Sequence, residues 1–259
     1  MPFAFVDGAQ LFWKLEGPDR APALVLLNSI GTDMDLWDAT LPILRERFRL
    51  LRIDTRGHGA SSAQAGDFSL DQLARDVLAV ADAAGLSRFS VAGVSLGGMI
   101  AMQLALLVPA TVDRLALICT SATMDSAAWN DRVIRVREQG MAWVANLSME
   151  RFLSDATRDT RPGLHATIRR QLLLMDRRGY AGCGAAIRDM ELAERLSAIA
   201  NPTLVVTGTR DISTPFEGHG DYLLAHIPKT THLSIHASHL APIEAPEQVA
   251  HALIAFVGI

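Results

Sequence analysis

The segment AGVSLGG, residues 92–98, constrains the fold of this chain more than any other stretch. It joins the apolar run RFSVAG to a second apolar run without charges, which is the pattern of a buried strand, a tight turn and a buried helix. A serine on such a turn is held in a strained backbone conformation, and Gly93 and Gly97 let the strand and the helix approach closely. The pattern predicts that the Ser95 hydroxyl is exposed at the start of the helix, as a nucleophile requires.

Strand-like and helix-like segments alternate through most of the chain. The strand-like runs are almost continuously apolar, as in strands that are covered on both faces. They lie at residues 23–28, 48–54, 88–93, 114–120 and 202–208. Between them, residues 69–85 carry apolar side chains at helical spacing and end at Gly85, a typical helix stop. The alternation predicts the α/β fold class, with a mostly parallel central sheet flanked by helices.

The alternation is interrupted between residues 121 and 195, where only helical patterns occur. We predict an inserted helical cap there, which divides the α/β core into a first part, residues 1–120, and a second part, residues 196–259. The insertion holds 12 Arg, no Lys and 10 Asp plus Glu, whereas the whole chain has 24 Lys plus Arg. Most of these arginines fit a solvated surface, and a few are candidates for contacting an anionic ligand.

Composition disfavours several classes of protein. A formal net charge of −4, without a basic cluster, argues against nucleic-acid binding. The N-terminal MPFAFVDGAQLFW lacks the basic start of a signal peptide, and glycines break the uncharged residues 89–112, so we expect no export signal and no membrane span. Cys119 and Cys183 are far apart, so we expect no disulfide, no metal site and a cytoplasmic protein.

A serine nucleophile needs a base and an acid that orients the base, in the chain order Ser, Asp or Glu, His for this type of turn. Asp211 directly follows the strand-like residues 202–208, at the sheet edge where parallel sheets bind ligands. His239 lies just beyond a strand-like segment, in a loop before the last helix. We predict Asp211 as the acid and His239 as the base. The other histidines are expected at the surface or in the core: His58, His165, His219, His226, His232, His236 and His251.

The oxyanion that forms from an ester carbonyl needs two backbone N–H donors. One belongs to the residue after the nucleophile, Leu96, and the other to the loop after residues 23–28. In that loop, NSIGTDMDLW at residues 28–37, Ile30 is the best-placed donor. The segment DTRGHGASS, residues 54–62, has glycines that suit a tight turn, and we expect it to be structural.

With these residues located, the chain resembles the α/β-hydrolase superfamily over its whole length, and more narrowly the 3-oxoadipate enol-lactonases. The narrower resemblance rests on NSIGTDMDLW, DTRGHGASS, GMIAMQLALLVPATVDRLAL, GYAGCGAAIRDMEL and SHLAPIEAPE. It implies the α/β-hydrolase fold and the opening of an enol-lactone ring to 3-oxoadipate in aromatic-compound catabolism. It further implies a Ser95-His239-Asp211 triad without cofactor or metal, and a small anionic lactone or ester as the binding partner.

An anionic substrate needs a cationic contact, which the arginine-rich insertion can supply. In SAAWNDRVIR, residues 126–135, Trp129 is a candidate apolar wall and Arg132 a candidate partner of the carboxylate. Arg188 is a second candidate. Each of these three residues also fits a surface or scaffold position.

Alternatives remain open for the function and for Cys183. A general carboxylesterase or a cofactor-free perhydrolase would use the same triad, and a small-molecule receptor on this fold would bind without turnover. Cys183, in GYAGCGAAIRD, has no second cysteine or histidine at ligand spacing and lies among small residues. We therefore expect it to be a packing residue.

Overall fold

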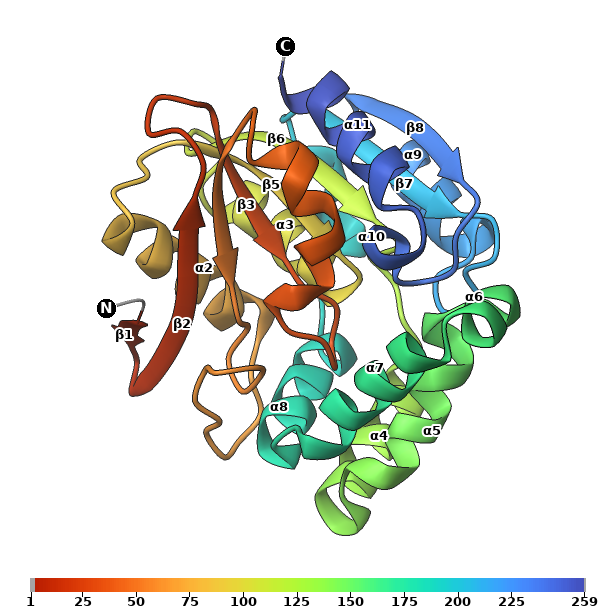
Figure 1. Ribbon diagram of the computed structural model, residues 1–259. Coiled ribbons are helices and arrows are strands. Elements are labelled where there is room, and N and C mark those ends of the chain that lie inside the picture. Colours follow the sequence, from red (N-terminus) through yellow and green to blue (C-terminus); the bar gives the residue numbers. More distant parts are fainter. Residues whose placement is uncertain (1–2, 259) are drawn as a thin grey trace.

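The computed structural model describes residues 3–258, which are organised around one eight-stranded sheet (Figure 1). The strands are β1 (Phe3–Val6), β2 (Ala9–Glu16), β3 (Ala23–Leu27), β4 (Arg49–Ile53), β5 (Phe89–Val94), β6 (Val112–Ile118), β7 (Thr203–Gly208) and β8 (Thr230–Ile235). Their order in the sheet is β1-β2-β4-β3-β5-β6-β7-β8. The pairs β1/β2 and β2/β4 are antiparallel, and all other neighbours are parallel. The predicted mostly parallel sheet is confirmed.

The five predicted strands correspond to β3 to β7 and differ from them by at most two residues at either end. These strands are the buried centre of the sheet, which explains their nearly continuous apolar sequence. The sequence did not predict the hairpin of β1 and β2, which alternates between buried and exposed residues at the edge of the sheet.

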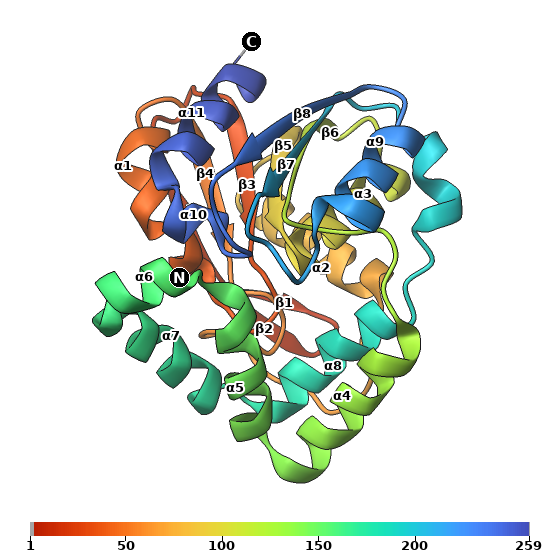
Figure 2. The same ribbon diagram turned by 90° about the vertical axis from the view of Figure 1, so that its right-hand side faces the viewer.

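Helices cover both faces of the sheet (Figure 2). Alternate strand residues point to opposite faces, so that Val25 of β3 joins one apolar layer and Leu24 joins the other. The helices and helical turns of the core are η1 (Met34–Thr40), α1 (Leu41–Leu44), α2 (Leu70–Ala83), α3 (Leu96–Leu107), η2 (Ala193–Ala198), η3 (Phe216–Gly220), α9 (Asp221–His226), α10 (Ala241–Glu244) and α11 (Pro246–Val257). Helices α2 and α3 close the first layer, whereas α1 and α11 close the second.

Helix α2 matches the helix predicted for residues 69–85. The Ser69 hydroxyl oxygen accepts the N–H of Gln72 and caps the first turn. Leu73 and Val77, one turn apart, are buried in the apolar layer that α2 shares with α3. Gly85 follows the helix with φ +71°, a conformation that glycine adopts without strain.

The uncharged segment 89–112 forms β5, the serine turn, helix α3 and the start of β6. Helix α3 is apolar on nearly every side because it is buried between the sheet and α2. Within residues 3–258, no helix is long and apolar enough to cross a membrane.

Five α-helices between β6 and β7 form a layer over the carboxyl ends of the parallel strands, at the bottom of Figures 1 and 2. These helices, called the cap below, are α4 (Ser126–Gln139), α5 (Met141–Phe152), α6 (Asp155–Thr160), α7 (Pro162–Leu174) and α8 (Arg177–Arg188). Helix α4 packs against α8, and α5 against α7. The Asp125 carboxylate caps α4, and Gly140, with φ +78°, turns the chain into α5. The boundary predicted at residue 195 falls within η2, which packs against α3 of the core.

Candidate active site

Ser95 lies on the tight turn between β5 and α3, where its sequence context predicted it. Its backbone has φ 55° and ψ −116°, a strained conformation for a residue with a side chain. A Cβ at Gly97 would stand 2.5 Å from the carbonyl oxygen of Leu27, and a Cβ at Gly93 would collide with the backbone of Gly97. The two glycines therefore allow β3, β5 and α3 to pack closely enough to hold the serine on its turn.

Asp211 and His239, on the loops after β7 and β8, contact each other. His239 Nδ1 is 2.9 Å from Asp211 Oδ2 and 3.1 Å from Oδ1, and both side chains are buried. Asp211 also accepts the N–H groups of Ser213 and Thr214 and the Thr214 hydroxyl. Burial alone would raise the pKa of Asp211, but His239 and these hydrogen bonds bring it well below its usual range. The ionised Asp211 holds Nδ1 as a donor, so that Nε2 of His239 carries the lone pair that can accept a proton.

The two predicted oxyanion donors have backbone N–H groups without a hydrogen-bond partner among residues 3–258. The Leu96 N–H lies in the first turn of α3, where no preceding helical carbonyl can accept it. In the loop after β3, the N–H of Gly31 is bound by His58 and that of Thr32 by the Ser29 carbonyl, so the Ile30 N–H remains available.

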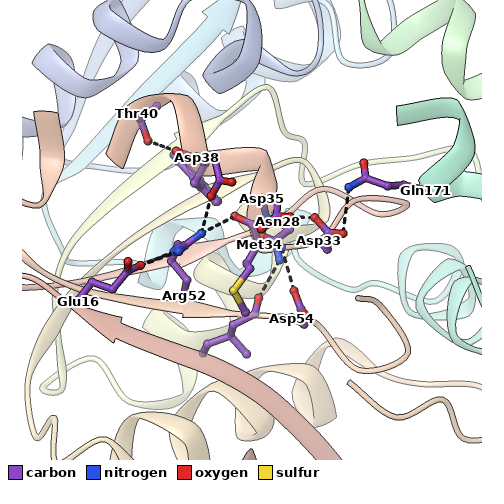
Figure 3. Close-up of polar contacts among 12 residues, drawn as sticks. Glu16, Asn28, Asp33, Met34, Asp35, Asp38, Thr40, Arg52, Asp54 and Gln171 are labelled. Atoms are coloured by element: carbon purple, nitrogen blue, oxygen red, sulfur yellow. Dashed lines mark hydrogen bonds and ion pairs between the residues drawn. The ribbon is translucent and has the colours of Figure 1, made fainter. Parts of the chain in front are cut away.

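Side chains from the core hold this loop at both ends. At its start, Asn28 Nδ2 donates to the carbonyl of Ile53 at 2.8 Å. Further along, Asp54 accepts the N–H of Met34 at 2.9 Å (Figure 3). It also accepts the N–H of Ala60 at 2.8 Å, so one carboxylate joins the loop to the turn after β4. The pKa of Asp54 is raised because burial outweighs the two N–H donors.

Figure 3 also shows the ion pairs behind the loop. The buried Arg52 guanidinium of β4 donates to Glu16 at 2.6 Å and to Asp38 at 2.8 Å. Gln171 of cap helix α7 donates to Asp33 at 3.3 Å, which connects the loop to the cap. Burial raises the pKa of Asp33 to about 6, and the charge of the nearby Asp35 adds to the shift.

A cavity lies between the core loops and the cap. The space in it that the centre of a water molecule can reach is about 40 Å³. Its lining comprises Ile30, Ser95, Met99, Met124, Trp129, Arg132, Leu147, Ser148, Arg151, Phe152, Tyr180, Ile187, Ser213, Thr214 and His239. The predicted nucleophile and base therefore share one mostly apolar chamber with one of the predicted oxyanion donors. Within residues 3–258, no group of three or more His, Cys, Asp or Glu side chains is placed to hold a metal ion.

The cap contributes two cationic side chains to the cavity, Arg132 of α4 and Arg151 of α5. The predicted pair Trp129 and Arg132 lies together here, with the Arg132 guanidinium 4.2 Å from the centre of the Trp129 ring. Neither arginine forms an ion pair within residues 3–258, and no carboxylate lines the chamber. Arg151 was missed by the sequence analysis, although its spacing from Leu147 and Ser148 on one face of α5 could have indicated it.

Arg188 does not line this cavity, which corrects the prediction that it is a second substrate contact. Its guanidinium donates to Asp67 at 2.8 Å and to both carboxylate oxygens of its neighbour Asp189. Its positive charge is thus satisfied by two carboxylates that do not line the cavity. Arg188 ties α8 to the loop before α2, a scaffold role that the sequence also allowed.

The His239 loop is fastened to the cap by a carboxylate that the sequence analysis did not single out. Glu244 accepts the N–H of Ser238 at 2.5 Å, together with the N–H and hydroxyl of Ser154 at 2.7 and 2.8 Å. Burial would raise the pKa of Glu244, but these hydrogen bonds lower it. Phe152 at the end of α5 stacks on the imidazole of His239, with ring centres 6.0 Å apart. The predicted base, His239, is therefore held by contacts from the core and from the cap.

Two residues assigned to packing lie in the contact between core and cap. His58 is fully buried beneath the loop after β3, and Cys183 is a buried free thiol on α8. Burial raises the pKa of the Cys183 thiol well above its usual range, so that it is not a thiolate at neutral pH. Its Sγ lies 3.6 Å from the carbonyl oxygen of Arg56.

Comparison with known proteins identifies the family. The family model of the alpha/beta hydrolase fold matches residues 22–246. The chain is 31% identical to 3-oxoadipate enol-lactonase 2 of Acinetobacter baylyi, over 92% of this chain and 89% of that protein. It is similar to the crystal structure of the enol-lactonase from Burkholderia xenovorans LB400, with TM-score 0.96, 31% identity and 100% of both chains covered. A hydrolase from Pseudomonas aeruginosa PA01 has TM-score 0.95 and 37% identity, over 99% and 98% of the two chains. The chain therefore belongs to the alpha/beta-hydrolase family and is an ester-bond hydrolase, similar over its length to 3-oxoadipate enol-lactonases.

Proposed function

We propose that this hydrolase opens a small enol-lactone that carries a carboxylate, converting 3-oxoadipate enol-lactone to 3-oxoadipate as a step of aromatic-compound catabolism. The observation that carries the proposal is the composition of the cavity. Ser95 and His239 line it from the core, and Arg132 and Arg151, which have no carboxylate partner among residues 3–258, line it from the cap. The similarity to enol-lactonases over most of the chain supports the same substrate class.

In the first half of the proposed reaction, His239 Nε2 takes the proton of the Ser95 hydroxyl while Oγ attacks the ring carbonyl of the lactone. The carbonyl oxygen becomes an oxyanion, which the N–H groups of Ile30 and Leu96 stabilise. Asp211 keeps the imidazole oriented and stabilises its positive charge. The bond between the carbonyl carbon and the ring oxygen then breaks. The enolate oxygen accepts the proton from His239 and stays attached through the acyl chain.

In the second half, water hydrolyses the ester between Ser95 and the opened acyl chain. His239 takes a proton from the water, and the resulting hydroxide attacks the acyl carbon. When the second tetrahedral intermediate collapses, the proton on His239 returns to the Ser95 oxygen and the acid is released. The enol of the product tautomerises to the ketone, so one lactone and one water give one 3-oxoadipate.

The two cap arginines are proposed to bind the carboxylate of the substrate. A guanidinium in an apolar chamber forms charge-assisted hydrogen bonds that are stronger than those at a solvated surface. A hydrogen bond to a charged group contributes about 1.5–3 kcal/mol, which corresponds to roughly 10- to 100-fold in KM. Arg132 is also held in place by the Trp129 ring.

The test compares the anionic enol-lactone with a neutral lactone of the same ring, following the loss of enol-lactone absorbance in the ultraviolet. Arg132→Ala and Arg151→Ala should each raise KM for the anionic lactone by about 10-fold or more, with a change of less than about twofold for the neutral one. Arg188→Ala is the matched control, because Arg188 belongs to the cap but lies outside the cavity. Equal effects of Arg132→Ala on both lactones would refute the anion site.

The catalytic assignment is tested separately. Ser95→Ala should lower kcat by about 10⁴-fold or more on every ester that the wild type turns over, and retained lactone hydrolysis would refute the mechanism. A marked preference of the wild type for a simple aryl ester over the lactone would instead indicate a general carboxylesterase. Binding of the lactone with no more than a single turnover would indicate a receptor.

A further inference from the structure

The segment DTRGHGASS has no role in the proposed reaction, yet its histidine contacts the oxyanion loop. His58 Nε2 is 3.0 Å from the N–H of Gly31, the residue after the proposed donor Ile30. His58 Nδ1 is 3.2 Å from the carbonyl oxygen of Arg56. The imidazole is buried, with 1% of the residue exposed. These two contacts join the turn after β4 to the loop after β3.

The two partners fix which nitrogen of His58 carries the proton. A backbone N–H can only donate, so Nε2 must accept from Gly31. A carbonyl oxygen can only accept, so Nδ1 must be the protonated nitrogen. Burial lowers the pKa of His58 to about 4, so the ring is neutral at the pH where a hydrolase with a histidine base works. His58 is thus a fixed acceptor placed directly behind the oxyanion loop.

This acceptor determines which N–H groups of the loop remain available. The N–H of Gly31 is taken by His58, and that of Thr32 by the Ser29 carbonyl, whereas the Ile30 N–H has no partner in the part of the chain that the structure describes. Gly31 has φ +83°, and a Cβ there would press against Leu172 of the cap, so its peptide is confined from the other side as well. The Ile30–Gly31 peptide is therefore held by His58, and the Ser29–Ile30 peptide, which carries the Ile30 N–H, is held through the Ser29 carbonyl by Thr32.

His58 is itself held by buried contacts. Arg56 forms a bidentate ion pair with Asp76 of α2, and its carbonyl oxygen also lies 3.6 Å from Sγ of Cys183 on α8. The backbones of Gly57 and of Gly179 on α8 are in direct contact. A Cβ on either residue would collide with the other, so both positions need glycine. The loop 54–62 is therefore clamped between the core and the cap, and His58 transmits this position to Gly31.

We infer that His58 is a positioning residue of the oxyanion hole: its Nε2 fixes the Ile30–Gly31 peptide, which adjoins the Ser29–Ile30 peptide that carries the Ile30 N–H, and so holds the loop with that N–H toward the reacting carbonyl. The inference rests on the proposed role of Ile30. His58 lies outside the cavity lining, so we expect it to act through the loop and not by contact with the substrate. Its contribution is expected in the rate of the chemical step and not in substrate binding, because the oxyanion exists only after attack.

Two substitutions separate the two contacts of the ring. His58→Gln keeps an oxygen acceptor near the position of Nε2, whereas His58→Asn keeps a donor near Nδ1 and loses the acceptor for Gly31. Aryl acetate hydrolysis and lactone hydrolysis are measured for both variants. Removing one oxyanion donor costs about 10²- to 10³-fold in kcat, and a misdirected donor costs less, so His58→Asn should lower kcat about 10- to 100-fold with KM unchanged. His58→Gln should retain most of the rate.

Two further measurements test the oxyanion hole and the tautomer of His58. Phenylboronic acid forms a tetrahedral adduct with the serine, and its affinity should fall in His58→Asn in parallel with kcat and recover in His58→Gln. In ¹⁵N NMR spectra of the wild type, Nε2 of His58 should appear as a nitrogen without a proton at neutral pH. A proton on Nε2, unchanged kcat in His58→Asn, or equal losses in both variants would overturn the inference, and the NMR spectrum decides even if His58→Asn does not fold.

The experiment also distinguishes this inference from the proposed function. A wild type that hydrolyses aryl acetate but no lactone would refute the substrate and would leave the comparison of His58 variants fully informative. A wild type with normal lactone turnover and a His58→Asn variant of equal kcat would retain the function and refute the role of His58.

Discussion

The ion pair between Arg56 and Asp76 offers the sharpest test of how the loop behind the proposed oxyanion hole is stabilised. Arg56 Nε donates to Asp76 Oδ2 at 2.8 Å and Nη2 donates to Oδ1 at 2.5 Å, with side-chain exposures of 0% and 6%. Asp76→Asn leaves the guanidinium buried without its counter-charge. Removing one partner of a buried pair costs about 3–5 kcal/mol, a large part of the usual stability of a domain.

Helix α2 contains its own control for this prediction. Asp71 pairs with Arg75 at 2.8 Å, but these side chains are 46% and 56% exposed. Asp71→Asn should therefore cost less than about 1 kcal/mol, because solvent screens an exposed pair. Urea unfolding followed by circular dichroism gives both free energies of unfolding, and the melting temperature of Asp76→Asn should fall by about 10 °C. Equal losses for Asp71→Asn and Asp76→Asn would refute the argument that burial makes the Arg56 pair important.

Three further predictions concern the turn, the base loop and the dependence of stability on pH. Gly97→Ala places Cβ 2.5 Å from the Leu27 carbonyl oxygen, so it should lose about 2 kcal/mol in urea unfolding and most ester hydrolysis. Gly163→Ala, with open space around it, should lose neither. Because hydrogen bonds lower the pKa of Glu244, this residue stabilises the fold above its unfolded-state pKa, and the stabilisation is lost as the pH falls through its folded-state pKa. Glu244→Gln should therefore reduce the loss of folding free energy at acid pH. An unchanged loss at acid pH would contradict this. The pKa of His58 falls from 6.5 to about 4 on folding, so between these values the unfolded chain binds a proton that the folded chain does not. The free energy of unfolding should therefore drop by roughly 3 kcal/mol as the pH falls from 6.5 to 4. The same drop in His58→Gln would contradict this.

Local sequence patterns predicted the centre of the fold well, because the strands β3 to β7 are buried on both faces and carry an unmistakable apolar signal. The serine turn could also be predicted from the sequence. The close contact of Gly97 with Leu27 allows no side chain at residue 97, and this requirement appears in the sequence as a glycine. The hairpin of β1 and β2 gave a weaker signal, because an edge hairpin that is partly exposed has a mixed pattern.

The substrate contacts were harder to predict, because arginines in a helical segment look alike in sequence. The Arg188 guanidinium donates a hydrogen bond to the carboxylate of Asp67, which lies 121 positions away in the sequence. Only the fold brings the two together. Arg132 and Arg151 lie on different helices, and the packing of the cap decides that both line the same chamber. What distinguishes a scaffold arginine from a candidate substrate contact is therefore whether folding brings a distant carboxylate to it.

The cap leaves the core once, after β6, and returns once, before β7. Trp129, Arg132 and Arg151 all lie within this excursion, whereas Ser95, Asp211 and His239 lie outside it. The segment proposed to recognise the substrate and the segments proposed to catalyse hydrolysis are thus separate in the sequence. Two junctions, one after β6 and one before β7, therefore suffice to exchange the cap. A chimera that carries the cap of a relative should acquire that relative's substrate preference while the proposed catalytic residues stay unchanged. Exchange of the cap alone would then be a simple evolutionary route to new substrates.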